Sequence, residues 1–121
     1  MTGTRLSIRI DLENGDRIGP GKIALLDAIR ATGSISAAAR ALGMSYRRAW
    51  LLVEGVNHAL RAPAVAAATG GRRGGGAVVT PAGERLVRLY RTIESQARTA
   101  AGGEFRAIGK LVRPEGRRAR A

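Results

Sequence analysis

The chain has 121 residues, 45% of them hydrophobic, and its 21 basic and nine acidic residues give a formal net charge of +12. The length allows one domain of ordinary size, and the apolar fraction is sufficient for a packed core. The absence of cysteine excludes disulfides and thiolate metal sites. A chain this basic is expected to bind a polyanion, with nucleic acid as the first candidate and an acidic membrane surface as the second.

The segment from Leu6 to Leu12 alternates apolar and polar residues, which predicts a half-buried strand. Glu13-Asn14-Gly15-Asp16 is a turn signal. Only Arg17 and Ile18 follow before the next glycine, so any returning strand is very short. We therefore expect the first strand to pair with a later strand or with a second copy of the protein.

The residues from Lys22 to Ala31 are predicted to form the first helix, which ends at Gly33. Its apolar face has helical spacing, and its charged residues are interpreted as a solvated face. The apolar positions are Ile23, Leu25, Leu26 and Ile29, and the charged ones are Lys22, Asp27 and Arg30.

Two further helices are predicted around a tight turn, a pattern typical of a helix-turn-helix. The shorter one runs from about Ser36 to Leu42, with the Ser36 hydroxyl as its N-terminal cap. Gly43 suits the left-handed position that ends such a helix. The inward-facing residues are predicted to be Ile35, Ala38, Ala39 and Leu42.

The longer helix is predicted to begin after the cap residue Ser45 and to run to about Leu60. Tyr46, Arg47 and Arg48 occupy its first turn, where a recognition helix meets base edges. Cations are unfavourable at a helix N-terminus, which suggests that the arginines serve a purpose other than helix stability. Trp50 is interpreted as a core residue, in a buried stripe made of Ala49, Trp50, Val53, Val56 and Leu60.

Two short strand-like runs, from Val65 to Thr69 and from Ala77 to Thr80, flank a loop that contains five glycines with Arg72 and Arg73. Such a hairpin is typical of a wing, which contacts the phosphate backbone or reaches into the minor groove. A P-loop would need Lys followed by Ser or Thr after its last glycine, and a flexible linker would not need two adjacent arginines.

The last predicted helix has Thr80 as its cap, Pro81 as its first residue and an end near Ala100. Its apolar stripe is long for one small domain to cover, so we expect it to pair with its equivalent in a second subunit. The residues assigned to dimerisation are Leu86, Leu89, Tyr90, Ile93 and Ala97. We expect residues 1–101 to form the domain and residues 102–121 to be a basic, flexible tail.

The run GSISAAARALGMSYRRAW, together with ATGGRRGGGAVVTPAGERL, resembles the N-terminal winged helix-turn-helix domain of ModE-type molybdate-responsive transcription regulators, which is itself similar to the LysR-type DNA-binding head. The resemblance covers roughly residues 4 to 100. It implies a mainly α fold with a little β structure, a homodimer, a recognition helix in the major groove and a wing on the DNA backbone. About twenty residues follow the last helix, fewer than the family's molybdate-binding modules need, so we expect the stand-alone form.

The sequence therefore predicts a homodimeric, sequence-specific transcriptional regulator of double-stranded DNA, and the resemblance implies control of molybdenum-related genes. The residues predicted to bind DNA are Ser36, Ser45, Tyr46, Arg47, Arg48, Arg72 and Arg73. An architectural nucleic-acid binder without sequence choice and an adaptor module that uses the last helix remain alternatives. No catalytic constellation, cofactor motif, metal cluster or small-molecule effector site is evident, and no membrane span or secretory signal is recognisable, so we expect a cytoplasmic protein that is not an enzyme.

Overall fold

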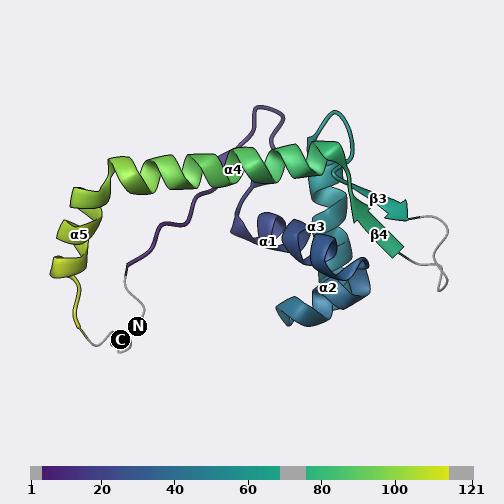
Figure 1. Ribbon diagram of the computed structural model, residues 1–121, viewed down its shortest axis with the longest axis horizontal. Coiled ribbons are helices and arrows are strands. Elements are labelled where there is room, and N and C mark those ends of the chain that lie inside the picture. Colours follow the sequence, from purple (N-terminus) through teal and green to yellow (C-terminus); the bar gives the residue numbers. More distant parts are fainter. Residues whose placement is uncertain (1–3, 69–75, 115–121) are drawn as a thin grey trace.

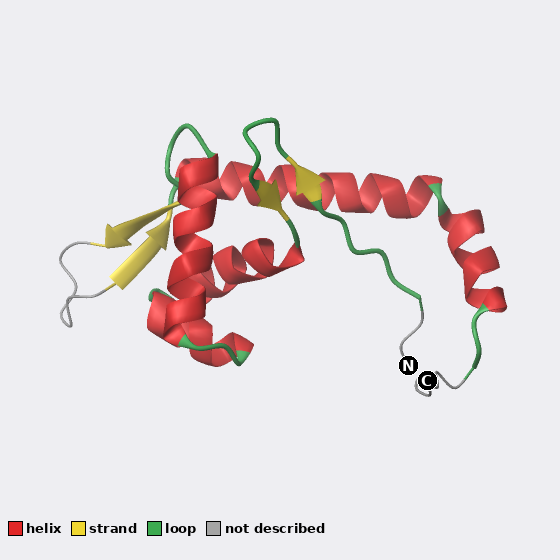
Figure 2. Ribbon diagram, turned by 180° about the vertical axis from the view of Figure 1, so that it is seen from behind, coloured by secondary structure: helices red, strands yellow, loops and turns green. Residues whose placement is uncertain are grey.

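The structure is a computed structural model that describes residues 4–68 and 76–114. The described residues form a mainly helical molecule with two small antiparallel sheets, an arrangement compatible with a winged helix (Figures 1 and 2). In chain order the elements are β1 (Ile10–Asp11), β2 (Arg17–Ile18), α1 (Pro20–Thr32), α2 (Ile35–Leu42), α3 (Tyr46–Ala59), β3 (Val65–Ala68), β4 (Gly76–Val79), α4 (Pro81–Ala100) and α5 (Gly102–Leu111).

The core lies where α1, α2 and α3 meet the start of α4 and the wing strands. All four apolar residues expected on the inner face of α1 are buried, which confirms the helical spacing read from the sequence. Small residues let the helices approach closely, and Ala38, Ala39 and Ala49 are fully or nearly fully buried where α2 packs on α3. In α2, however, Ile35 is only partly buried and Leu42 is exposed, so its inward face is narrower than expected.

The predicted N-terminal strand is mostly absent, because only Ile10–Asp11 pairs with Arg17–Ile18. The very short returning strand is therefore the partner, and the pairing with a later strand is not observed in the described chain. The alternation nevertheless holds, since Leu6, Ile8 and Ile10 are partly buried while their neighbours are exposed. A residue of α4 secures this segment, because the Tyr90 hydroxyl donates a 2.7 Å hydrogen bond to the Ile8 carbonyl oxygen.

The cap of α2 is Ser34 and not Ser36. The Ser34 hydroxyl accepts a hydrogen bond from the Ala37 N–H at 3.0 Å, and the helix begins one residue earlier than expected. Both serines can cap a helix, and the choice depends on which neighbouring residue packs inward. Ile35 packs against the core, which places Ser34 at the position before the first turn.

The other helix boundaries follow the sequence more closely. Gly33 and Gly43 end α1 and α2 in the left-handed conformation, with φ of 81° and 69°. Thr80 caps α4 by accepting from the Gly83 N–H at 3.1 Å, and Pro81 is its first residue. The helix ends at Ala100 as expected, but a second helix, α5, follows it at once, and this helix was not predicted.

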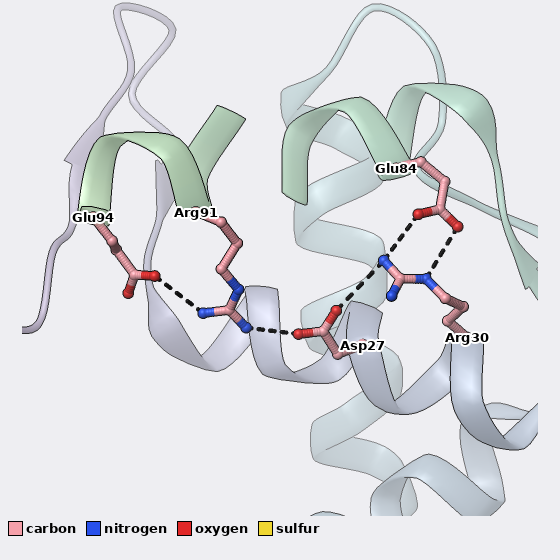
Figure 3. Close-up of polar contacts among 5 residues, drawn as sticks. All are labelled: Asp27, Arg30, Glu84, Arg91 and Glu94. Carbon is pink, nitrogen blue, oxygen red and sulfur yellow. Dashed lines mark hydrogen bonds and ion pairs between the residues drawn. The ribbon is translucent and has the colours of Figure 1, made fainter. Parts of the chain in front are cut away.

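Charged residues of α1 and α4 form a chain of ion pairs across the helix interface (Figure 3). Arg91 on α4 contacts Asp27 at 2.6 Å, and Arg30 on α1 contacts Glu84 at 2.8 Å in a two-pronged hydrogen-bonded pair. Arg30 also lies 3.5 Å from Asp27 and Arg91 3.1 Å from Glu94. Asp27 and Arg30, which were expected on a solvated face, keep 36% and 47% of their side chains exposed, but both are also paired with α4.

This network aligns the first half of α4 along α1, while the second half projects beyond the three-helix core and leads into α5 (Figure 1). Hydrogen bonds to Asp27 and then to Glu94 raise the pKa of Arg91, which keeps its guanidinium charged. No helix among residues 4–68 and 76–114 is both long and apolar enough to cross a membrane.

Candidate nucleic-acid interface

The turn between α2 and α3 is held by backbone hydrogen bonds that leave the start of α3 facing outward. The Gly43 N–H bonds to the Arg40 carbonyl at 3.2 Å, and the Met44 N–H bonds to the Ala39 carbonyl at 3.0 Å. Ser45 then caps α3, as predicted, by accepting from the Arg48 N–H at 3.1 Å. The turn thus fixes the direction in which the first residues of α3 project.

Tyr46, Arg47 and Arg48 are all exposed in the first turn of α3. Within the described part of the chain, neither arginine is recorded in an ion pair, whereas Arg30 and Arg91 each contact two carboxylates. The unpaired N–H groups at a helix N-terminus also favour an anion there. The first turn of α3 therefore presents two guanidinium groups and a phenol to any polyanion that approaches it.

A hollow of about 380 Å³ lies beside this turn, between α3 and the start of α1. Arg47, Arg48 and Ser45 line one part of it, and Lys22 lines another, together with Leu51, Leu52 and Gly55. Lys22 is held in place because its ammonium donates to the Arg17 carbonyl oxygen at 2.8 Å. A phosphate group could meet three cationic side chains here. The sequence predicts a solvated face for Lys22, because helical spacing does not reveal that it lies next to α3.

Ser36 and Arg40 lie on the exposed side of α2. Since Ser34 serves as the cap, the Ser36 hydroxyl is not used for that purpose. Its predicted role in DNA binding stays a prediction.

The prediction for Trp50 was wrong, because its side chain is 42% exposed and is not part of the core. The buried stripe of α3 consists of Ala49, Val53 and Val56, with Leu60 partly buried. Trp50 follows Ala49 directly and therefore points about 100° away from it around the helix axis, which places the indole beside the buried stripe and not within it.

One residue that the sequence analysis missed connects α3 to the wing. The Asn57 side chain accepts from the Ala64 N–H at 2.8 Å and the Val65 N–H at 3.0 Å, and it donates to the Val65 carbonyl at 3.1 Å. Nothing in the helical pattern distinguished Asn57. The nearest signal was Pro63, which directly precedes the two backbone N–H groups that Asn57 accepts from.

The wing itself is a hairpin in which Val65 pairs with Val79 and Ala68 pairs with Gly76. A hydrogen bond of 2.9 Å from the Ala77 N–H to the Gly33 carbonyl fastens β4 to the end of α1. Both strands were expected, the first over residues 65–69 and the second over residues 77–80. The second begins and ends one residue earlier than expected, and position 69 lies outside the described residues. Arg72 and Arg73 lie outside the described residues, so their predicted backbone contacts remain predictions.

The residues assigned to dimerisation differ in how far they are exposed to solvent. Leu89 and Ile93 are 49% and 43% exposed on α4, whereas Tyr90 is only 1% exposed and packs inside the single chain. Leu86 and Ala97 are partly buried. Burial, and then the charge of Glu94, raise the pKa of the Tyr90 phenol, so this residue stays neutral and keeps its hydrogen bond to Ile8.

The sequence of the chain is similar to those of transcription regulators and molybdenum proteins. The chain is 34% identical over 125 residues to the molybdenum transport protein ModE of Azotobacter vinelandii, which covers 93% of the chain and 46% of that protein. It is 45% identical over 71 residues to the DNA-binding transcriptional dual regulator ModE of Escherichia coli, which covers 59% of the chain and 27% of that protein. The homologues of this chain are ModE and Mop proteins.

One Mop homologue is the molybdenum-pterin-binding protein MopB of Rhodobacter capsulatus, which is 57% identical over 81 residues, 67% of the chain and 30% of MopB. No protein-family model matches the chain. The chain spans less than half of the length of each of these ModE and Mop relatives. The similarity to ModE agrees with the resemblance read from the two motifs of the sequence.

Proposed function

We propose that this chain is a winged helix-turn-helix module that binds double-stranded DNA as a homodimer and regulates transcription at specific sites. The observation that carries the proposal is the first turn of α3, where Arg47 and Arg48 project outward beside Lys22 with their positions fixed by the Ser45 cap. Two relatives named as transcriptional regulators add support, because they share 48% and 45% of the aligned residues with this chain.

Each element has a place in the proposed complex. The first turn of α3 enters the major groove, which is about 12 Å wide, and the wing lies along the backbone beside it. Asn57 fixes the wing relative to α3, so that both can engage one stretch of DNA. A bidentate contact from Arg47 or Arg48 to guanine would discriminate against other bases by about 1–3 kcal/mol.

A homodimer would present two copies of α3 to successive major grooves, about 34 Å apart, and so read a roughly palindromic site. The exposed Leu89 and Ile93 on the projecting part of α4 support this arrangement. They are four residues apart and therefore lie on the same side of the helix. Apolar side chains exposed at this spacing are typical of a helix that pairs with another helix.

The role is binding and not catalysis, and it is exercised in the cytoplasm, where bacterial DNA lies. Because the relatives carry the names ModE and molybdenum-pterin-binding protein, we propose that the genes under control are connected with molybdenum. Whether molybdate acts on this chain is decided by experiment, since the described residues form no site that we can assign to it.

The test is selection of bound fragments from genomic DNA at physiological salt, with and without added molybdate. We expect a short, roughly symmetric motif to be enriched near molybdenum-related genes. Binding without any enriched motif would favour an architectural nucleic-acid binder. No binding to any DNA at low salt would favour an adaptor module that uses α4.

A further inference from the structure

Two aromatic side chains are exposed on α3, directly beside the arginines of its first turn. Tyr46 is 54% exposed and Trp50 is 42% exposed. They are four residues apart in the helix, which places them about 40° from each other around its axis, on the same side. The chain has only four aromatic residues, one Trp, two Tyr and one Phe, so half of them are on this short stretch of surface.

These side chains are not explained by the packing of the chain itself. The core side of α3 is formed by Ala49, Val53 and Val56, and neither aromatic residue belongs to the core or to the partly buried side chains that pack against it. An exposed indole leaves apolar area in water, at a cost of about 25 cal/mol for each Å². Adjacent exposed aromatic residues are typical of a binding surface.

Asn57 shows which edge of α3 carries the two aromatic residues. It lies seven residues after Trp50 and eleven after Tyr46, close to a whole number of helical turns in both cases, so all three share one side of the helix. The Asn57 side chain is bonded to Val65 of β3. The aromatic pair therefore lies on the edge of α3 that leads to the wing, within the area that DNA would cover.

The surroundings of the pair favour DNA over a protein partner. Arg47, Arg48 and Arg40 are all exposed close to it in the sequence, and these cations suit a polyanion. The major groove of DNA offers one apolar group to such a surface, the C5-methyl group of thymine. An aromatic face next to a guanidinium can thus contact a thymine methyl while the arginine bonds to a neighbouring guanine.

We propose that Tyr46 and Trp50 form a contact surface for thymine methyl groups in the major groove and that this surface contributes to the sequence preference of the protein. This inference rests on the proposed function, since it requires α3 to enter the groove. It assigns a specificity role to Trp50 and a second chemistry to the recognition turn, apolar contact with thymine beside the hydrogen bonding of the arginines.

The experiment uses the full chain and the DNA motif obtained by selection from genomic fragments. Each thymine of the motif is replaced in turn by deoxyuridine, which removes the methyl group and keeps the hydrogen-bonding edge. We expect one or two positions in each half-site at which the substitution weakens binding by about fourfold, the effect of one lost methyl contact. The same substitutions are then measured with Trp50→Ala and Tyr46→Ala, as double-mutant cycles.

At the sensitive positions, at least one of the two variants should bind thymine-containing and deoxyuridine-containing DNA equally. Leu111→Ala is the matched control, since it truncates an exposed apolar side chain on α5, away from α3, and it should retain the full sensitivity. Trp50→Phe keeps an aromatic ring and should retain most of it. If Trp50→Ala fails to fold, Trp50→Phe and Tyr46→Ala still test the proposal.

The outcomes separate this inference from the function on which it rests. A preferred motif with no sensitivity to deoxyuridine, or a sensitivity unchanged in both variants, would overturn the inference and leave the proposed function standing. Variants that bind DNA normally but lose association with another protein would also overturn it. The absence of any preferred motif would overturn the proposed function and this inference together.

Discussion

Asn57 and Val65 are joined by two hydrogen bonds in opposite directions. The Asn57 amide nitrogen donates to the Val65 carbonyl oxygen at 3.1 Å, and the Asn57 amide oxygen accepts from the Val65 N–H at 3.0 Å. A third bond, of 2.8 Å, runs from the Ala64 N–H to the same oxygen. One side chain of α3 therefore determines where the wing begins, and the geometry of the DNA-binding face depends on it.

We expect Asn57→Ala to lower the free energy of unfolding by about 2 kcal/mol, because it leaves three partly buried backbone groups without partners. Urea unfolding measures this change. Asn14→Ala is the matched control, since it removes two exposed bonds, one from the Asn14 amide nitrogen to the Ala59 carbonyl and one from the Asp16 N–H to the Asn14 amide oxygen. Because water can replace both partners, it should cost less than about 1 kcal/mol. Equal losses for the two variants would contradict the role given to Asn57.

Gly83 in the first turn of α4 has no room for a side chain. A Cβ atom there would lie 2.7 Å from a methyl carbon of Val79 and closer still to the Ala64 carbonyl oxygen. We expect Gly83→Ala to destabilise the protein by about 1–3 kcal/mol, even though alanine is the better helix former. Gly21→Ala in α1 is the control, because a Cβ at Gly21 meets nothing within 4 Å. Thermal unfolding of both variants should show a loss at Gly83 and no loss at Gly21.

The ionisation of Tyr90 makes the free energy of unfolding depend on pH in the alkaline range. Burial, and then Glu94, raise the pKa of its phenol above the ordinary value of 10.0, so the folded chain holds the phenolic proton more tightly than the unfolded chain does. The stabilising contribution is therefore complete below about pH 10 and is lost as the pH rises through the higher folded-state pKa.

Tyr90→Phe should be less stable than the native protein at neutral pH by about 1 kcal/mol, because the bond to the Ile8 carbonyl is lost. The difference in the free energy of unfolding should shrink above pH 10, when the native phenol ionises. Urea titrations at a series of pH values measure it, and a difference that stays constant up to the highest pH would contradict this explanation.

Local sequence signals were sufficient to predict most of the helix ends that position the DNA-binding face. Gly43 ends α2, Ser45 caps α3, and Thr80 with Pro81 starts α4, because each depends only on the residue itself and its neighbours along the chain. The spacing of apolar residues in α1 was sufficient to predict its buried face, because this spacing also depends only on neighbouring residues. The exposed first turn of α3 follows directly from the position of its cap.

Contacts between distant residues could not be predicted in the same way. Asp27 pairs with Arg91 and Arg30 pairs with Glu84, and both pairs join residues that lie more than fifty positions apart. Trp50 lies about 100° around α3 from the buried Ala49, at the margin of the apolar stripe, so only the packing of neighbouring helices decides whether it is covered. The helix α5 begins with two glycines, which are poor helix formers, and the sequence therefore predicts a tail there.

Leu89 and Ile93 are exposed on the projecting part of α4, and we expect them to form the centre of the proposed dimer interface. Changing both to Asp should yield a monomer in sedimentation analysis, because a carboxylate in an apolar interface loses its hydration. The unfolding temperature of the monomer should change little, since both side chains are exposed in the single chain. A dimer that survives the double change would place the interface elsewhere.

Alanine variants of the arginines test whether α3 contacts bases while the wing contacts the DNA backbone. Arg47→Ala or Arg48→Ala should weaken binding to the selected motif by about fivefold to 150-fold, the equivalent of 1–3 kcal/mol, and weaken non-specific binding much less. Arg72→Ala, in the predicted wing loop, should weaken binding to all sequences alike and reduce the salt slope by about one unit. Arg98→Ala, which removes an exposed cation near the far end of α4, is the control and should change neither quantity strongly. Binding curves on the selected motif and on unrelated DNA, at several salt concentrations, measure both the affinity and the salt slope. Equal losses of affinity for the Arg47, Arg48 and Arg72 variants on every sequence would show that the arginines of α3 contact only phosphates.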